Sequence, residues 1–148
     1  MSTCPSAVLV RNASAGSCDY TIQGTEANVS ATDNCGLTSM VHNYTSASSS
    51  TTLANAVFNV GTTTVVWTAT DASGNVTTCT QTIQVVDNQA PVFANCPANM
   101  TIGTYTGCNG GTTWTAPTAT DNCAGTITGT HNVTLPITTQ GTTVVTWT

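Results

Sequence analysis

The chain of 148 residues carries six acidic side chains, one Arg and no Lys, so only 5% of its residues are charged and its formal net charge is −5. Nucleic acids and anionic membrane surfaces attract proteins through several basic side chains. This chain offers Arg11 alone, which excludes both kinds of partner. No stretch approaches the roughly 20 apolar residues that span a bilayer, and this excludes membrane insertion.

The composition favours strands over helices. Thr and Ser supply 46 residues, and β-branched Thr suits the half-buried surface of a sheet. Apolar residues do not recur at helical spacing over any long window, whereas alternation with a period of two is common. The sequence therefore predicts an all-β protein.

The first half of the chain predicts short strands separated by turns. Residues 8–11 and 20–22 read as two strands, joined by a turn at residues 12–16. Alternation resumes with shifted parity at residues 29–31, which indicates a bulge. Residues 46–52 are nearly all Ser and Thr, and we expect them to form a loop insertion.

The clearest local signal is a hairpin formed by residues 63–71 and 76–86. Apolar side chains alternate with Thr or Gln along both runs, so that each run has one core-facing side. Between them, residues 71–75 place an Asp that can cap its own turn before a Gly suited to positive φ. We expect the two runs to be antiparallel neighbours, with Trp67 and Ile83 facing the core.

The chain contains two copies of one unit. Ala-Thr-Asp-Asn-Cys occurs at residues 31–35 and again at 119–123, and three other landmarks match in the same order. These are Cys-Pro at residues 4 and 96, a Gly shortly before Cys18 and Cys108, and a Gly-Thr-Thr run ending in Trp-Thr at residues 61–68 and 141–148. Pro91 cannot donate to a ladder and marks an extended joint. We divide the chain into residues 1–88 and 89–148, the second copy ending before its last strand.

Seven cysteines without a C-x-x-C pair indicate disulfides in an oxidising compartment, because zinc ligands normally come in closely spaced pairs. The first copy holds Cys4, Cys18, Cys35 and Cys79, and the second holds Cys96, Cys108 and Cys123. The repeat offset places the missing eighth cysteine eleven residues beyond Thr148. We expect the odd cysteine to lack its partner for this reason, not to be a reactive thiol.

Together these landmarks resemble the hyalin repeat, or HYR, module of extracellular proteins. The matching positions are Cys4-Pro5, Asp33-Asn34-Cys35, residues 61–67, Thr70-Asp71, Gly74-Asn75, Cys79, Asp87, Pro91 and, in the second copy, residues 117–123. The first copy departs from the family's pattern at Val29, where the family has Pro. The resemblance implies tandem immunoglobulin-like β-sandwiches, the second truncated, of the kind found in arrays on secreted proteins and bacterial surface adhesins.

The rod geometry that the resemblance implies bears on the disulfides. It places the loop of Asp33-Asn34-Cys35 and the turn of residues 71–75 at one end of the sandwich. That favours a Cys35–Cys79 bridge and leaves Cys4–Cys18, with Cys96–Cys108 as its counterpart. Four cysteines allow three connectivities, and the other two stay open.

Candidate binding residues are few. Asp33 and Asp71 gather at one end, and Asp87 lies at the joint between the copies. Turn capping is the preferred interpretation of these carboxylates, and a calcium site is the alternative; no other cofactor is expected. Trp67 and its equivalent Trp147 are expected in the core. For Trp114 we favour a structural role over stacking on a sugar.

The sequence does not indicate an enzyme. It has no G-x-S-x-G elbow and no phosphate-cradling glycine loop, and His42 and His131 lie in unmatched contexts. We expect a structural or adhesive module of a large extracellular cell-surface protein, a spacer or filament segment. Its expected partners are neighbouring modules of the same chain, with glycans or cell-surface molecules as further candidates. The alternatives are an accessory, carbohydrate-binding module of a secreted hydrolase and a self-assembling subunit that accepts a strand from a neighbour.

Overall fold

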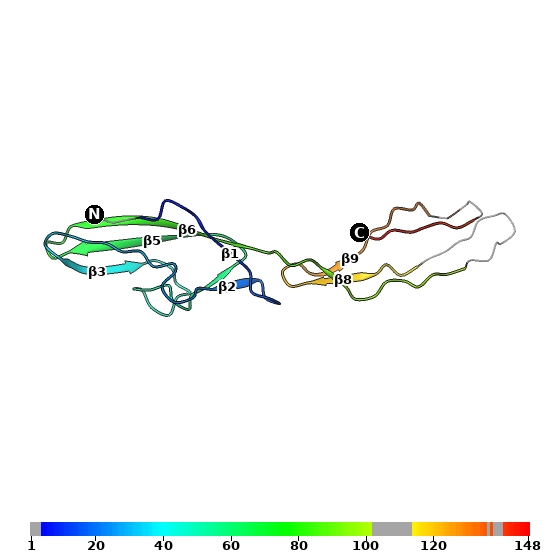
Figure 1. Ribbon diagram of the computed structural model, residues 1–148, viewed down its shortest axis with the longest axis horizontal. Helices are drawn as coiled ribbons and strands as arrows, with labels where there is room; N and C mark the ends of the chain where they lie inside the picture. Colours follow the sequence, from blue (N-terminus) through cyan, green and yellow to red (C-terminus); the bar gives the residue numbers. More distant parts are fainter. Residues whose placement is uncertain (1–3, 102–113, 136, 138–140) are drawn as a thin grey trace. The chain divides into compact units, whose positions relative to one another are not determined.

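The computed structural model describes residues 4–101, 114–135, 137 and 141–148. Within these residues the chain is all β, with nine strands in three sheets and no helix (Figure 1). The chain divides into two compact units, Met1–Asn88 (unit 1) and Gln89–Thr148 (unit 2).

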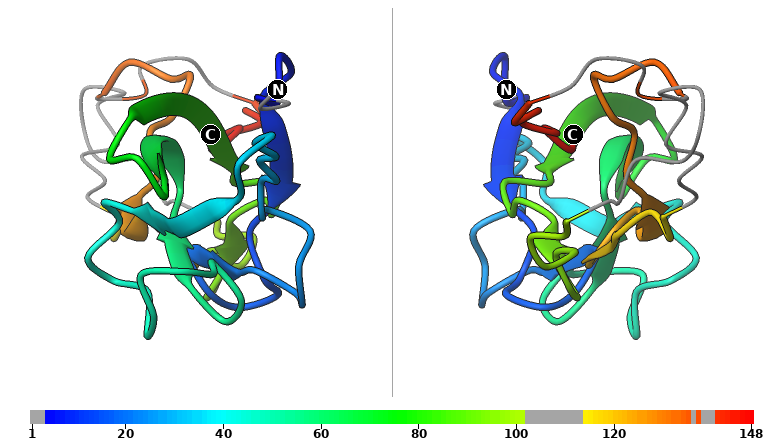
Figure 2. Two further views of the ribbon diagram at one scale, coloured as in Figure 1. Left: turned by 90° about the vertical axis from the view of Figure 1, so that its left-hand side faces the viewer. Right: turned by 90° about the vertical axis from the view of Figure 1, so that its right-hand side faces the viewer.

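Unit 1 contains two sheets. Its strands are β1 (Leu9–Asn12), β2 (Asp19–Thr21), β3 (Leu37–His42), β4 (Val57–Asn59), β5 (Gly61–Asp71) and β6 (Val76–Val86). A four-stranded sheet has the order β1-β6-β5-β3, and β2 pairs with β4 in a separate sheet (Figures 1 and 2). All neighbours are antiparallel except β1 and β6, which run parallel.

The predicted hairpin is confirmed as β5 and β6, with β5 beginning two residues earlier than expected. The two strands pair from Gly61↔Val85 to Thr70↔Val76. Four side chains of its inner face are at most 2% exposed; they are Val65, Trp67, Ile83 and Val85. The opposite face carries Thr at directly opposed positions, as in the pairs Thr64↔Thr82 and Thr68↔Thr78. The period-two alternation of the sequence therefore reports which side of this hairpin is buried.

Both sheets of unit 1 share one core. Phe58 of β4 and Ile22, which follows β2, are fully buried in the same cluster as Trp67 and Ile83 of the larger sheet. The ring of Tyr44 stacks on Phe58 at a centroid distance of 4.2 Å and covers this cluster from one side. Apolar burial from both sheets is what stabilises unit 1, since neither sheet could cover its own inner face.

Several elements differ from the sequence-based expectation. The strand expected at residues 29–31 does not form beyond a single bridge position, so the bulge prediction was wrong. The strands β3 and β4 were not anticipated, because β3 buries His42 among its few core residues and β4 has only three residues. Residues 46–52 form the expected loop.

Unit 2 has a smaller sheet in its described residues. The strands β7 (Val92–Phe93), β8 (Thr118–Asp121) and β9 (Gly125–Thr128) are antiparallel neighbours in that order. A further antiparallel bridge joins His131 to Trp147. Residues 102–113, which include Cys108, lie outside the described residues.

Replacing Gly74 with Ala should destabilise unit 1 by about 1 kcal/mol, because a residue with a Cβ is strained in the left-handed region. Gly74 has φ 83°, and no heavy atom lies within 4 Å of an added Cβ, so the backbone alone sets the cost. Urea denaturation followed by circular dichroism measures the change. Ser73→Ala in the same turn is the control and should stay near the natural stability. Equal stability of G74A and S73A would contradict the turn geometry.

Candidate functional site

A disulfide joins Cys4 to Cys79, with a Cα–Cα distance of 5.5 Å and a sequence separation of 75 residues. The parallel pairing of β1 with β6 explains this bridge. Leu9 is opposite Ile83, so the segment before β1 continues along β6 toward Cys79. Cys79 itself is only 7% exposed and faces the core. The bridge therefore ties the segment that leads into unit 1 to the last strand of that unit.

This bridge corrects the favoured disulfide pairing. The expected Cys35–Cys79 and Cys4–Cys18 bridges were wrong, because Cys79 is bonded to Cys4 and Cys35 is a free, exposed thiol. The expected Cys96–Cys108 bridge was also wrong, because Cys96 is a free, exposed thiol. Cys4 pairs with Cys79 because the N-terminal segment runs parallel to β6 and beside it. No local pattern in the sequence predicts this contact.

Two further cysteines, Cys18 and Cys123, are also disulfide-bonded. Cys123 occupies in unit 2 the place that Cys35 occupies in unit 1, at the end of the repeated Ala-Thr-Asp-Asn-Cys. The two copies of one sequence motif thus differ in the oxidation state of their cysteine.

The aspartates of both copies cap their own turns. The Asp71 carboxylate accepts hydrogen bonds from the backbone N–H groups of Ser73 and Asn75, both at 2.8 Å, and from the Asn75 side chain at 2.8 Å. The Asn75 side chain and then the turn's N–H groups hold the pKa of Asp71 below its ordinary value. Asp33 accepts from the N–H of Cys35 at 2.8 Å in the same manner.

The three carboxylates proposed for calcium do not come together. Asp33 and Asp71 do share one end of unit 1, because Leu37 at the start of β3 is opposite Asp71. Asp87 follows the far end of the eleven-residue β6 and lies at the opposite end of the unit. Within the described residues no group of three or more His, Cys, Asp or Glu side chains could hold a metal ion. Asp33, Asp71 and Asp87 therefore do not form one calcium site, and calcium binding at the end that Asp33 and Asp71 share stays a prediction.

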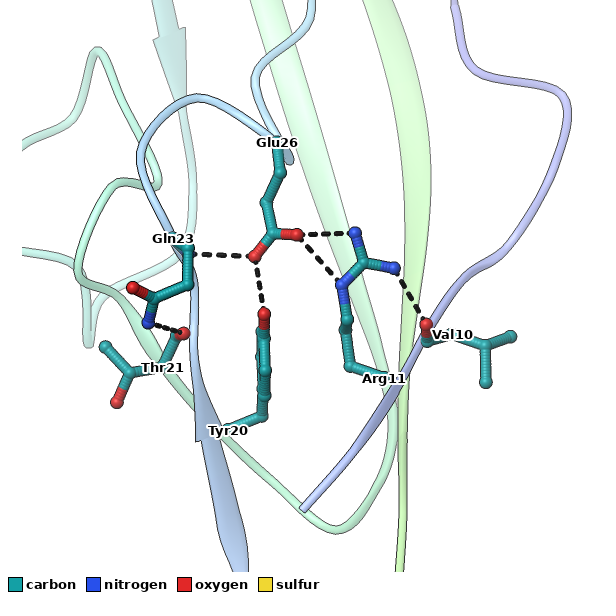
Figure 3. A network of polar contacts seen from close by, with 6 residues as sticks. All are labelled: Val10, Arg11, Tyr20, Thr21, Gln23 and Glu26. Atoms are coloured by element: carbon teal, nitrogen blue, oxygen red, sulfur yellow. Dashed lines mark hydrogen bonds and ion pairs between the residues drawn. The ribbon is translucent and has the colours of Figure 1, made fainter. Parts of the chain in front are cut away.

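A polar network centred on Glu26 links the two sheets of unit 1 (Figure 3). Arg11 of β1 donates from Nε to Glu26 Oε2 at 2.8 Å, and its Nη2 contacts the same oxygen. Tyr20 of β2 donates its hydroxyl to Glu26 Oε1 at 2.9 Å, and the backbone N–H of Gln23 donates to Oε1 at 2.8 Å. One carboxylate is thereby shared between an edge strand of the larger sheet and a strand of the smaller one.

The network fixes the charge state of its members. Burial opposes the ionisation of Glu26, but the hydrogen bonds from Gln23, Arg11 and Tyr20 outweigh it and hold the pKa of Glu26 below its ordinary value. The hydrogen bond to Glu26 raises the pKa of Arg11. Sequence reasoning missed this network, although its signal was available: a single Arg in a chain of so few charges is expected to have an acidic partner.

The three tryptophans pack among neighbouring residues. Trp67 is 1% exposed and donates from Nε1 to Oε1 of the buried Gln81 at 3.0 Å, which confirms its core position. In unit 2, Trp114 contacts Trp147 and His131 edge to face, with centroid distances of 6.3 and 5.6 Å. The Nε1 of Trp114 is buried and without a hydrogen-bond partner. This packing supports a structural role for Trp114, while stacking on a sugar stays a prediction.

Glu26→Gln should destabilise unit 1 at pH 7 by about 2 kcal/mol, because it removes the charge from hydrogen bonds that link the two sheets. The lowered pKa of Glu26 also fixes the pH dependence. The stabilisation is complete above the unfolded value of about 4.5 and is lost as pH falls through the lower folded pKa. In urea titrations the difference in stability between E26Q and the natural chain should therefore be smaller at pH 3 than at pH 7.

Gln23→Ala is the matched control for that comparison. It removes the side-chain bond from Gln23 to the Thr21 carbonyl but keeps the backbone N–H that donates to Glu26. Its stability should change little at either pH. A loss in E26Q that is the same at pH 3 as at pH 7 would show that the carboxylate charge is not what stabilises the network.

A match to a known protein family is consistent with the all-β fold and the disulfides described above. The model of the HYR domain family matches residues 1–85, which is most of unit 1 and more than half of the chain. No curated protein and no solved structure matches the chain. Among the described residues there is no helix long and apolar enough to cross a membrane. The resemblance seen in the sequence is thus confirmed, and the chain belongs to the HYR domain family.

Proposed function

We propose that the chain is a structural and adhesive segment of a large extracellular repeat protein, acting as a spacer or filament segment of an adhesin. Its family suggests an extracellular repeat module of the adhesion type. The disulfides at Cys4, Cys79, Cys18 and Cys123 fit an extracellular location, because such bonds persist in oxidising compartments. In this role the chain is not an enzyme, and its partners are neighbouring modules.

The proposed architecture is a pair of immunoglobulin-like sandwiches in tandem. The four-stranded and two-stranded sheets of unit 1, which share one core, support this fold for the first unit. The repeated sequence landmarks support it for unit 2.

The observation that carries the mechanical role is the position of the Cys4–Cys79 bridge. Cys4 precedes the first strand, and Cys79 lies on the last strand of unit 1, seven residues before that strand ends at Val86. Tension applied along the chain therefore passes from Cys4 through the sulfur atoms to β6. The chain between the two cysteines, which are 75 positions apart in the sequence, does not bear this tension, so unit 1 keeps its length even if its core is strained.

Two alternatives make different demands on the structure. An accessory carbohydrate-binding module needs an exposed aromatic face, and Trp114 is half-buried against two other rings. A self-assembling subunit needs an open sheet edge in unit 2 that accepts a strand from a neighbour. The load path through Cys4 and Cys79 favours the structural role over both.

Single-molecule stretching of the chain tests the load path. With the disulfide intact, unfolding of unit 1 should release only the few residues outside the bridged loop. After reduction, the released length should grow by at least about 250 Å, because a sequence separation of 75 residues extends by about 3.4 Å per residue. Cys35→Ser is the matched control and should give the short release. Equal release lengths with and without reductant would contradict the load path.

Labelling of intact source cells with an antibody against unit 1 tests the location. The proposal expects the epitope to be accessible without permeabilisation, or present in the secreted fraction. Labelling that appears only after the cells are permeabilised would contradict an extracellular role.

A further inference from the structure

The two histidines, which the sequence alone left unmatched, occupy the same place in the two units. His42 of β3 is opposite Trp67 of β5, and His131 is bridged to Trp147, the equivalent of Trp67 in the repeat. Both histidine rings meet their tryptophan edge to face, with centroid distances of 4.9 and 5.2 Å. Each histidine begins the pattern His-Asn-x-Thr, at residues 42–45 and 131–134. The two copies therefore share one more landmark.

The asparagine of this pattern makes the same pair of hydrogen bonds in each unit. The backbone N–H of Asn43 donates to the carbonyl of Val66 at 3.1 Å, and the N–H of Val66 donates to Asn43 Oδ1 at 2.9 Å. In unit 2, Asn132 exchanges the same two bonds with Thr146, at 3.3 and 2.8 Å. Because a backbone N–H can only donate, the side-chain atom that it faces is the oxygen. The amide nitrogen Nδ2 is therefore turned away from this contact.

The fold leaves the amide nitrogen of both asparagines unused. Asn43 and Asn132 are exposed, and so are Thr45 and Thr134 two residues later. Within the part of the chain that the structure describes, no hydrogen bond involves either Nδ2 or either threonine hydroxyl. Asn43 directly follows the end of β3, in a segment without regular structure. Each unit thus presents an oriented amide group beside a threonine that the fold does not engage.

Asn-x-Ser and Asn-x-Thr are the acceptor sequences, or sequons, of N-linked glycans. The chain has six, at Asn12, Asn28, Asn43, Asn75, Asn99 and Asn132. Two of them are blocked, because Nδ2 of Asn28 donates to Thr52 Oγ1 at 3.0 Å and Nδ2 of Asn75 donates to Asp71 Oδ2 at 2.8 Å. Asn12 and Asn99 are exposed, but neither has a counterpart in the other copy. Asn43 and Asn132 combine a sequon, an unused Nδ2 and the same geometry in both units.

We propose that Asn43 and Asn132 are N-glycosylation sites, one in each module, at which a sugar is attached to Nδ2. The donor is a sugar activated by a phosphate leaving group, either a lipid-linked oligosaccharide or a nucleotide sugar. Nδ2 forms a bond to the anomeric carbon of the sugar and loses one proton to solvent. The bond from that carbon to the phosphate oxygen breaks, and the phosphate leaves with the electron pair. Oδ1 takes no part in this step and keeps its contact with the backbone N–H.

Mass spectrometry of intact glycopeptides from the protein isolated from its source tests the assignment. Peptides that contain Asn43 and Asn132 should carry sugar, and peptides that contain Asn28 and Asn75 should be unmodified. A single sugar on the acceptor would identify the nucleotide sugar as the donor, whereas an oligosaccharide would identify the lipid-linked donor. An unmodified Asn43 or Asn132, or equal occupancy at Asn28 and Asn75, would overturn the proposal.

Two substitutions of Thr45, expressed in the source cells, separate the sequon from the contact that Asn43 makes with Val66. Thr45→Ala removes the sequon and leaves that contact in place, so the glycan on Asn43 should be lost while the glycan on Asn132 remains. Thr45→Ser keeps the sequon and should keep both glycans. Because Thr45 is exposed, circular dichroism should show both variants folded.

A glycan that persists on Asn43 in T45A would also overturn the proposal. The inference adds a modification to the proposed extracellular role and does not depend on the load path through the disulfide. Surface labelling of intact cells and single-molecule stretching report that role without reference to glycan occupancy. Failure of the glycosylation sites is therefore distinguishable from failure of the proposed function.

Discussion

The hairpin of β5 and β6 is the element on which unit 1 depends. It is paired along its whole length, and β1 and β3 add to its two outer edges. Its inner face supplies Trp67 and Ile83 to the shared core, against which the smaller sheet packs. It also carries Cys79, the attachment point for the N-terminal segment. One pairing register positions the sheet, the core side chains and the disulfide together. A shift of one residue in that register would move the buried side chains and Cys79 to the solvent-facing side of the sheet.

The hairpin could be predicted from the sequence, whereas the disulfides could not. Alternation over eleven residues and an Asp-x-x-Gly turn are local patterns, and they identify both strands and their buried face. The Cys4–Cys79 bridge depends on a parallel contact between segments more than seventy residues apart. Placing Cys35 and Cys79 near one end of the unit was not sufficient, since the side chain of Cys79 points into the core and Cys35 remains exposed in a loop.

The candidate site residues show the same division between local and distant structure. Turn capping by Asp33 and Asp71 follows from residues two to four positions apart and was anticipated. The network around Glu26 joins residues from two different sheets, and its geometry exists only once those sheets have packed. A strand as short as β4, with one buried side chain, likewise gives a sequence pattern too brief to distinguish from a loop.

The attachment of Arg11 to Glu26 has a consequence for the resistance of the chain to proteases. Proteases that cleave after Lys or Arg find one candidate bond in the whole chain, the one that follows Arg11. That bond lies inside β1, whose backbone is paired with β6, and the arginine side chain is already engaged by a carboxylate. Cleavage by this large class of enzymes would first require local unfolding of the strand. Scarcity of basic residues thus gives the module durability as well as a low charge.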